Sequence, residues 1–415
     1  MPHNMVNTYG EKYAEVIVRV GLNVQPGQKV IVQFDQHGFD MLPHIATEAY
    51  KAGAALVIPI FVDNTMLAIQ AEHGTIFDER AENTIIAPGI ENAFRDGAAR
   101  LVLISEDSSA LTKAPGAKIA QIRKINSKSS KGLVKLLMST HSNWCIAAVA
   151  SPAWAKKVYR GFPLKNAVDL LWSNILNACR IESSESNAVE DWKKHNAILK
   201  AKSTFMNENR FDALWFKSPE GTDLTIGLAV DHIWKGGQKI TKSGIPCNSN
   251  LPTEEIFTTP HRMKVHGVAK ITRPMNIEGI SILNAEFVFE NGRIVEAKAD
   301  KGQNKLRELL RGRNADRLGE VALVPASSRV GRLLLGDSDE SRSFHSILFD
   351  ENAASHIAIG QSYSHCMDGE DNQEMRGANQ ADIHLDWMIG SNTMDVWGIK
   401  DGKKTQLMSS GEWCF

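Results

Sequence analysis

Side chains that could bind metal ions gather in four short segments of the second half of the sequence. The segments cover residues 250–260, 317–325, 348–363 and 381–390. Together they supply four carboxylates and two imidazoles, namely Glu255, Glu320, Glu351, His356, His384 and Asp386. Oxygen and imidazole ligands without a thiolate suit zinc, cobalt, manganese or magnesium and disfavour copper(I) and iron–sulfur centres. Six side chains are more than one tetrahedral ion takes, whereas two ions about 3.5–4 Å apart that share a carboxylate would use them all.

The first two segments each leave a second interpretation open. Glu254 and Glu255 are adjacent, so on a strand they point to opposite faces and at most one of them enters a given site. The alternative for this pair is an exposed acidic turn. Glu320 opens an apolar strand, where a carboxylate lies either at the exposed rim or buried with a partner, because an unpaired buried charge is costly. Neither segment predicts a metal site by itself.

The other two segments place histidines on apolar strands. His356 follows a group of acidic residues, although a turn capped by Asp350 or Asn352 and a partly buried core histidine would give the same pattern. His384 and Asp386 are two residues apart, which puts both on one face of a strand. Ordinary alternation at a solvent-facing surface explains this pair almost as well, so the motif is weak when taken alone.

The first half of the chain has the alternation of strands and helices that builds a parallel sheet. Four apolar runs are predicted to be buried strands, at 29–34, 55–61, 101–105 and 144–150. Helices are expected between them and before the first. The first helix carries Tyr13, Val16 and Val20 on one face and is expected to end at Gly21.

A parallel sheet suggests nucleotide binding, but the glycine motifs for it are missing. The first strand is followed by Asp35-Gln36-His37-Gly38-Phe39 rather than by GxGxxG, and the sequence has no Walker A loop. A scaffold role is therefore favoured for this half, with binding of a nucleotide or another small ligand as the alternative.

The pattern changes in the second half, where short strands follow one another. Residues 214–217 and 223–227 flank a hairpin turn, and further runs lie at 279–283, 285–289 and 293–297, with a tight turn at 290–292. The small polar stretch 183–186 marks a domain boundary. We predict an α/β protein of two domains. Residues 1–185 form an N-terminal α/β domain with a mostly parallel sheet, and residues 186–415 form a C-terminal α+β catalytic domain with a large, mainly antiparallel sheet.

The composition excludes several classes of protein. The 415 residues include 47 Lys+Arg and 48 Asp+Glu, a formal net charge of -1, so no excess of cations is available for binding nucleic acid. The N-terminal segment does not resemble a secretory signal, and no stretch approaches the roughly 18 apolar residues of a membrane span. Five scattered cysteines form no CxxC pair, which disfavours disulfides and a cysteine-bound zinc ion. A cytoplasmic protein without nucleic-acid or membrane partners is expected.

The motifs in both halves resemble the M29 family of metallo-aminopeptidases, the group that includes aminopeptidase T, aminopeptidase S and PepS. In the first half the resemblance rests on YAEVIVRVGLNVQPGQKV and AYKAGAALVIPIF. In the second half it rests on LWFKSPEGTDLTIGL, NLPTEEIFTTP, RLGEVALVP, LFDENAASHIAIGQSY and HLDWMIGS. The last five motifs together are specific, and the resemblance covers nearly the whole chain.

The resemblance implies a set of functional residues. The family's ligands for two metal ions fall on Glu255, Glu320, Glu351, His356, His384 and Asp386. Its catalytic tyrosine falls on Tyr363, and Glu254 is the alternative to Glu255. The ions are expected to be zinc or cobalt, with manganese or magnesium as alternatives. The substrates are expected to be peptides of broad N-terminal residue type, and the family forms homodimers.

The expected reaction is hydrolysis of the N-terminal peptide bond by a hydroxide that bridges the two ions, with Tyr363 stabilising the oxyanion. Two departures from the family pattern leave all the ligands intact: the charged stretch 326–346 and Gln380-Ala381 before His384. Both leave the substrate preference open. Competing interpretations are a metal-dependent hydrolase of another amide or an ester, and a scaffold whose acidic clusters are surface features.

Overall fold

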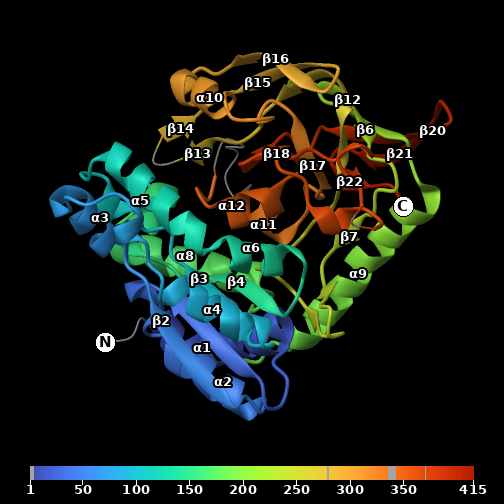
Figure 1. Ribbon diagram of the computed structural model, residues 1–415. Coiled ribbons are helices and arrows are strands. Elements are labelled where there is room, and N and C mark those ends of the chain that lie inside the picture. Colours follow the sequence, from blue (N-terminus) through green and yellow to red (C-terminus); the bar gives the residue numbers. More distant parts are fainter. Residues whose placement is uncertain (1–3, 278–279, 335–342, 370) are drawn as a thin grey trace. The chain divides into compact units, whose positions relative to one another are not determined.

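The structure, a computed structural model, describes residues 4–277, 280–334, 343–369 and 371–415 (Figure 1). The chain divides into two compact units. One comprises Met1–Lys193 with Gln238–Leu251, and the other comprises Lys194–Gly237 with Pro252–Phe415. The charged stretch 326–346 lies partly outside the described residues.

The first unit is built on a five-stranded sheet in which every neighbouring pair is parallel, with the strand order β10–β4–β3–β1–β2. The strands are β1 (Lys29–Phe34), β2 (Leu56–Phe61), β3 (Ala99–Ile104), β4 (Trp144–Ala148) and β10 (Asn250–Leu251). The four strands predicted from the first half of the sequence are therefore confirmed. The fifth comes from a part of the chain about a hundred residues further on, and a small ladder of β8 (Lys239–Ile240) and β9 (Pro246–Cys247) precedes it.

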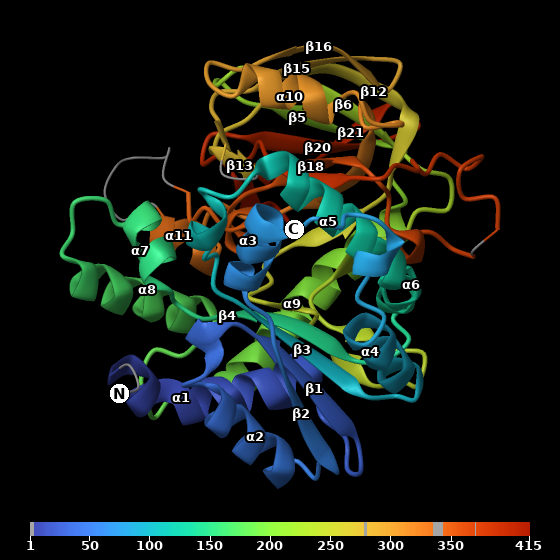
Figure 2. The ribbon, with the colours of Figure 1, turned by 60° about the vertical axis from the view of Figure 1, so that its left-hand side comes forward.

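One helix precedes the first strand and the others lie in the connections between parallel strands, as a parallel sheet requires. They are α1 (Asn4–Val16), α2 (Leu42–Lys51), α3 (Asn64–His73), α4 (Ile86–Arg95), α5 (Gly116–Ser129), α6 (Lys131–Met138), α7 (Pro152–Val158) and α8 (Leu164–Ala178). Ile31 of β1 packs with Phe94 of α4 and Leu136 of α6, so these two helices cover one face of the sheet. Figure 2 shows α1 and α2 side by side along the sheet.

The sequence predicted that the first helix ends at Gly21, and this prediction is wrong. After α1 the chain continues through a π-helical segment, Ile17–Leu22, and the left-handed residue that ends it is Asn23, with a φ of 51°. Gly21 serves close packing instead. A Cβ at this position would lie 2.7 Å from Sγ of Cys145 and 2.9 Å from Cδ1 of Leu251.

The strand predicted at 55–61 is present as β2, but the expectation that it is buried is wrong. Its side chains are half-buried or exposed along its whole length. The reason is its position, because β2 is the edge strand of the sheet. An apolar run in the sequence does not distinguish an edge strand from a central one.

The second unit contains two antiparallel sheets (Figure 1). The eight-stranded sheet has the order β16–β15–β12–β6–β5–β20–β21–β22 and the five-stranded sheet has the order β19–β18–β17–β11–β7. The first consists of β5 (Ala213–Lys217), β6 (Asp223–Leu228), β12 (Pro260–Lys270), β15 (Glu286–Glu290), β16 (Arg293–Lys298), β20 (Asp395–Lys400), β21 (Lys403–Ser409) and β22 (Glu412–Trp413). The second consists of β7 (Lys235–Gly236), β11 (Ile256–Thr258), β17 (Leu318–Leu323), β18 (His356–Gly360) and β19 (His384–Met388).

Smaller elements complete the second unit. They are the hairpin of β13 (Met275–Ile277) and β14 (Ile280–Ile282), and the helices α10 (Gln303–Leu309), α11 (Arg329–Leu334) and α12 (Ile347–Asp350). The helix α9 (Ala188–Asn209) begins in the first unit and ends in the second. The predicted hairpin of β5 and β6 is confirmed. So is the tight turn before β16, where Asn291 and Gly292 have φ values of 50° and 77°.

The two antiparallel sheets share one hydrophobic core. Phe216 and Ile226 come from the eight-stranded sheet, and Val321, Ile357 and Trp387 come from the five-stranded sheet. Successive side chains of a strand point to opposite faces, so the residues between these core positions point to the other face of the five-stranded sheet. We call this other face the site face.

The predicted fold class is confirmed, since a parallel sheet in one unit is combined with large antiparallel sheets in the other. Within the part of the chain that the structure describes, no helix is both long and apolar enough to cross a bilayer.

Candidate metal centre

Three neighbouring strands of the five-stranded sheet carry most of the predicted ligands on the site face. In the register of the sheet, Ala358 of β18 lies opposite Glu320 of β17 on one side and opposite Asp386 of β19 on the other. His384 lies opposite Gly360 in the same way. The small side chains between the acidic residues leave space above the sheet. This is why the polar groups can converge there.

A β-bulge between Leu318 and Glu320 sets the direction of the Glu320 side chain. Leu318 and Val321 both point into the core, so one extra residue must be accommodated between them, and the bulge turns Glu320 to the site face. Glu320 is 3 % exposed. The sequence left open whether this carboxylate lies at the rim or is buried, and the structure buries it.

Gly360 ends β18 in a conformation that requires glycine. Its φ is 104°, and a Cβ at this position would lie 2.1 Å from the carbonyl oxygen of Ile383. The chain turns here, and Tyr363 follows three residues later, at the edge of the site face. Its ring centroid lies 4.7 Å from that of His384 and 5.7 Å from that of Phe257.

The two histidines are oriented in the same way. Nδ1 of His356 lies 3.1 Å from the carbonyl oxygen of Ala354, and Nδ1 of His384 lies 2.7 Å from that of Gln361. A carbonyl oxygen can only accept a hydrogen bond, so each Nδ1 donates its proton. Each Nε2 therefore faces the site.

Carboxylate oxygens lie close to both of these Nε2 atoms. Nε2 of His356 lies 3.3 Å from Oε2 of Glu255. Nε2 of His384 lies 3.0 Å from Oε2 of Glu320 and 3.4 Å from Oδ1 of Asp386. If the ring is neutral with its proton on Nδ1, then Nε2 and the carboxylate oxygens are all hydrogen-bond acceptors. Their close approach is favourable only if a proton or a metal cation lies between them.

The ligand atoms form two groups that share one residue. Among the described residues, Glu255, Glu320 and His356 offer atoms within 4.8 Å of one another, and so do Glu320, His384 and Asp386. Glu320 belongs to both groups. Two ions bound side by side would therefore share the carboxylate of Glu320.

The structure brings Glu255, and not Glu254, into this cluster. The two carboxylates point in different directions, and Oε2 of Glu254 lies 3.8 Å from Nε2 of His195 in α9. The same His195 nitrogen lies 2.8 Å from the carbonyl oxygen of Thr253 and holds this segment in place. Of the alternatives left open by the sequence, the geometry favours Glu255.

Glu351 lies beside the cluster without belonging to either of the two close groups. Burial and the charges of Asp386 and Glu255 raise the pKa of Glu351 well above its ordinary value, so its carboxylate is near both. It is carried by the short 3-10 turn Glu351–Ala353, just before β18. All seven predicted residues therefore lie together: six in the cluster or beside it, and Tyr363 at its edge.

The cluster gathers buried carboxylates, and positive charge between them stabilises such a group. Burial and the charges of Glu255 and Asp386 raise the pKa of Glu320. Burial opposes protonation of His356, but the carboxylate of Glu255 outweighs it and raises the pKa of His356 to about 10. Without a metal, protons must neutralise these groups, and a divalent cation can take their place. The residues fit a centre with oxygen and nitrogen ligands.

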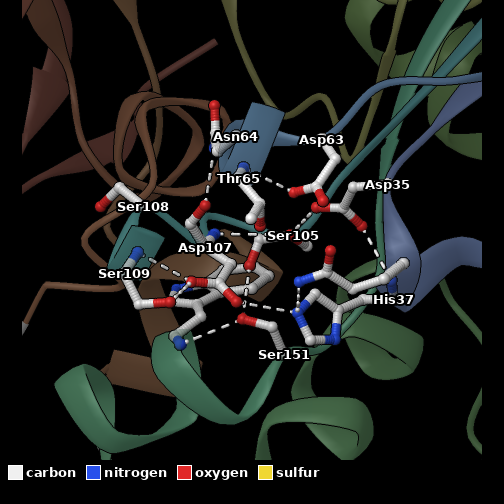
Figure 3. Close-up of polar contacts among 12 residues, drawn as sticks. Asp35, His37, Asp63, Asn64, Thr65, Ser105, Asp107, Ser108, Ser109 and Ser151 are labelled. Carbon is white, nitrogen blue, oxygen red and sulfur yellow. Dashed lines mark hydrogen bonds and ion pairs between the residues drawn. The ribbon is translucent and has the colours of Figure 1, made fainter. Parts of the chain in front are cut away.

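A second polar cluster lies at the carboxyl ends of the parallel strands in the first unit (Figure 3). Asp35 accepts a hydrogen bond of 2.9 Å from the backbone N–H of His37, whose Nε2 lies 2.9 Å from Oδ2 of Asp107. Asp63 accepts one of 2.8 Å from the backbone N–H of Thr65 and caps α3. A cavity of about 200 Å³ lies among these side chains. Three carboxylates around it would repel a phosphate group, which disfavours nucleotide binding further.

The carboxylates and imidazoles gathered on the site face are the ligand set of a metal-dependent hydrolase. Comparison with known proteins defines the family. The family described as "Thermophilic metalloprotease (M29)" matches residues 7–413, and the chain therefore belongs to the M29 metalloproteases. The resemblance seen in the sequence is confirmed.

Named relatives cover nearly the whole chain. Aminopeptidase T of Thermus thermophilus is 41% identical over 412 residues, which are 97% of this chain and 98% of the relative. Aminopeptidase AmpS of Bacillus subtilis is 35% identical over 412 residues, with 97% and 98% covered. The solved structure of wild-type AmpT from Thermus thermophilus superposes with a TM-score of 0.91 at 40% identity, covering 98% of this chain and 99% of that one.

Two residues beside the site were not assigned to it from the sequence. His195 lies on a helix far from the motifs, and no pattern pointed to it. Asn352 was considered only as a turn cap. It is fully buried, and its amide contacts both the segment of Glu255 and the turn of Glu351. The only feature of the sequence that pointed to Asn352 was its position as an uncharged polar residue directly after Asp350 and Glu351.

Proposed function

We propose that this protein is a metal-dependent aminopeptidase that removes N-terminal residues from peptides. Two divalent ions would be held by Glu255, Glu320, Glu351, His356, His384 and Asp386. The observation that carries this proposal is the orientation of the two histidines. Both donate Nδ1–H to a backbone carbonyl and turn Nε2 toward carboxylates, which is the arrangement that histidine ligands of metals adopt. The curated relatives named as aminopeptidases support the choice of reaction.

The proposed ligands would have distinct roles in the reaction. When bound, two divalent ions supply a water that is acidified enough to give hydroxide near neutral pH, and they polarise the scissile carbonyl. Glu320 would hold both ions at a fixed spacing, because it belongs to both ligand groups. The backbone acceptors of His356 and His384 hold each ring with its Nε2 toward the centre.

Tyr363 would donate a hydrogen bond to the oxygen that becomes negative in the transition state. Burial and the charges of Glu320 and Asp386 raise its pKa well above the ordinary value, so the phenol keeps its proton at neutral pH. A donor that is already in place needs no reorganisation when charge develops. Its ring is held between His384 and Phe257.

Finer features of the proposal rest on the sequence: the family resemblance gives the substrate range and the dimer, the ligand types and the resemblance give the ions, and the scattered cysteines favour the location. They are zinc or cobalt as the first choice of ion, with manganese or magnesium as alternatives, a broad preference for N-terminal residues, a homodimer and a cytoplasmic location. Metal analysis of the purified protein tests the identity of the ion. Analytical ultracentrifugation tests the dimer.

The central experiment uses protein stripped with a chelator. It is assayed on a panel of amino-acid p-nitroanilides before and after zinc, cobalt, manganese or magnesium is added back singly. Activity should be lost and should return with at least one ion. N-acetylated substrates are the control, because an aminopeptidase rejects them and a general amidase or esterase does not. Cleavage of acetylated substrates at a similar rate would replace the proposal with the broader hydrolase.

A further inference from the structure

We infer that Asn352 is a positioning residue that fixes the segment of Glu255 relative to the turn of Glu351 in the metal centre. This inference rests on the proposed function, since it concerns the same ligands. Asn352 is fully buried in the second unit and lies directly after Glu351. It is not itself a ligand in the proposal, because its amide oxygen and nitrogen are both hydrogen-bonded to other groups.

The side-chain amide of Asn352 connects two segments that are far apart in the sequence. Its Oδ1 accepts a hydrogen bond of 2.6 Å from the backbone N–H of Glu254. Its Nδ2 donates one of 2.8 Å to the carbonyl oxygen of Leu348, in the last turn before Glu351. One amide thus ties the segment that carries Glu255 to the turn that carries Glu351.

The same nitrogen also reaches a proposed ligand directly. Nδ2 of Asn352 lies 3.4 Å from Oε1 of Glu351, a longer contact than the other two. This contact orients one oxygen of that carboxylate. Its own backbone is held as well, because Oγ of Ser328 donates to the carbonyl oxygen of Asn352 at 3.1 Å.

An amide is the chemical group that this position needs. The Glu254 N–H requires an acceptor, and the Leu348 carbonyl and the Glu351 carboxylate require a donor. A carboxylate would satisfy the first and repel the other two, and an apolar side chain would satisfy none. Substitution of a residue that hydrogen-bonds to a metal ligand typically weakens metal affinity by about 10- to 100-fold. Loss of this amide should therefore affect metal binding more than it affects the stability of the fold.

The test compares Asn352→Asp and Asn352→Ser with the wild type. The first variant keeps the shape and the acceptor but loses both donors. The second removes the acceptor without adding a charge, and it keeps the proposal testable if the first does not fold. Zinc affinity is measured by competition with a chromogenic chelator, and the thermal midpoint of the metal-free protein is measured separately. Both variants should bind zinc about 10- to 100-fold more weakly, and excess zinc should restore much of their turnover.

The matched control is Asn143→Asp in the first unit. Asn143 is also fully buried, and its amide donates to the carbonyl oxygen of Leu22 at 2.6 Å and accepts from Nε2 of Gln28 at 2.6 Å. Its loss should lower the thermal midpoint and leave zinc affinity unchanged. If the Asn352 variants behave in the same way, with wild-type zinc affinity and a lower midpoint, Asn352 is only structural and the inference is overturned.

The wild-type titration separates this inference from the proposed function. A wild-type protein that binds no zinc, cobalt or manganese would overturn the metal centre itself, whatever the variants do. A wild type that binds metal and cleaves p-nitroanilides, beside Asn352 variants of equal affinity, would overturn only the role of Asn352.

Discussion

Nε2 of His384 lies 3.0 Å from Oε2 of Glu320, while Nδ1 of the same ring donates to the carbonyl oxygen of Gln361. An imidazole oriented in this way can bind a metal together with the carboxylate, or take up a proton and pair with it. Burial disfavours the protonated ring, but the charges of Asp386 and Glu320 outweigh it and raise the pKa of His384 well above its ordinary value. A divalent ion bound between His384 and Glu320 would take the place of the proton that this pair favours.

Removal of the metal should lower the stability of the second unit as well as abolish activity. Ligands that bind only the folded state stabilise it, by about 2.7 kcal/mol at a free concentration a hundred times the dissociation constant. The measurement is thermal unfolding of protein stripped with a chelator, before and after reloading with zinc. The midpoint should rise on reloading. An unchanged midpoint at saturating zinc, cobalt, manganese and magnesium would count against a metal centre in this cluster.

Tyr363→Phe should separate metal binding from turnover. The variant keeps the ring that contacts His384 and Phe257 and loses only the hydroxyl. Loss of one donor to a developing oxyanion typically lowers kcat by about 10²- to 10³-fold. Metal content should stay at the wild-type level, and KM should change far less than kcat. Near-normal turnover with full metal occupancy would remove Tyr363 from the mechanism.

Glu320→Gln and Glu255→Gln should differ in how many ions they lose. Glu320 belongs to both ligand groups and Glu255 to only one. The first substitution should therefore weaken binding at both positions, whereas the second should spare the position near His384 and Asp386. Titration with zinc, followed by metal analysis after gel filtration, measures the stoichiometry. Equal losses in the two variants would show that Glu320 is not shared.

The sequence predicted which segments form strands and helices better than it predicted which of these elements pair with one another. The runs at 29–34 and 144–150 became β1 and β4 because alternating strands and helices are a local pattern. The full burial expected for 55–61 was wrong, because whether a strand lies at an edge depends on which strands pair with it. The return of 238–251 to the first unit was also beyond local patterns, since β10 is only two residues long.

The site could be predicted as a set of residues but not as a geometry. His384 and Asp386 share a face because the strand period is two, and this follows from their spacing alone. The choice of Glu255 over Glu254 depends on His195 and Asn352, which hold that segment from distant parts of the chain. The burial of Glu320 depends on a bulge, and its marker in the sequence is Gly319, which precedes Glu320 directly.

His232 should make the second unit less stable in mild acid. Its backbone forms an isolated antiparallel β-bridge with Met367, and its Nδ1 donates to the carbonyl oxygen of Ala229 at 2.9 Å. Burial lowers the pKa of His232, and the positive charges of Arg210 and Lys400 lower it further. The hydrogen bond to Ala229 raises it by less, so the pKa stays below its ordinary value. The unfolded chain therefore binds a proton more readily than the folded one. Stability is highest above the ordinary histidine pKa and falls as the pH drops through it.

His232→Asn tests this dependence, because the amide nitrogen of Asn can still donate to Ala229 and does not titrate. The midpoint of urea unfolding is measured at about pH 7.5 and about pH 5.5, one unit on either side of the ordinary histidine pKa of about 6.5. The variant should lose less stability than the wild type between these values. His73→Asn, at a side chain that is 76% exposed, is the matched control and should decline as the wild type does. A decline in His232→Asn as steep as in the wild type would show that this histidine is protonated equally in the folded and unfolded states.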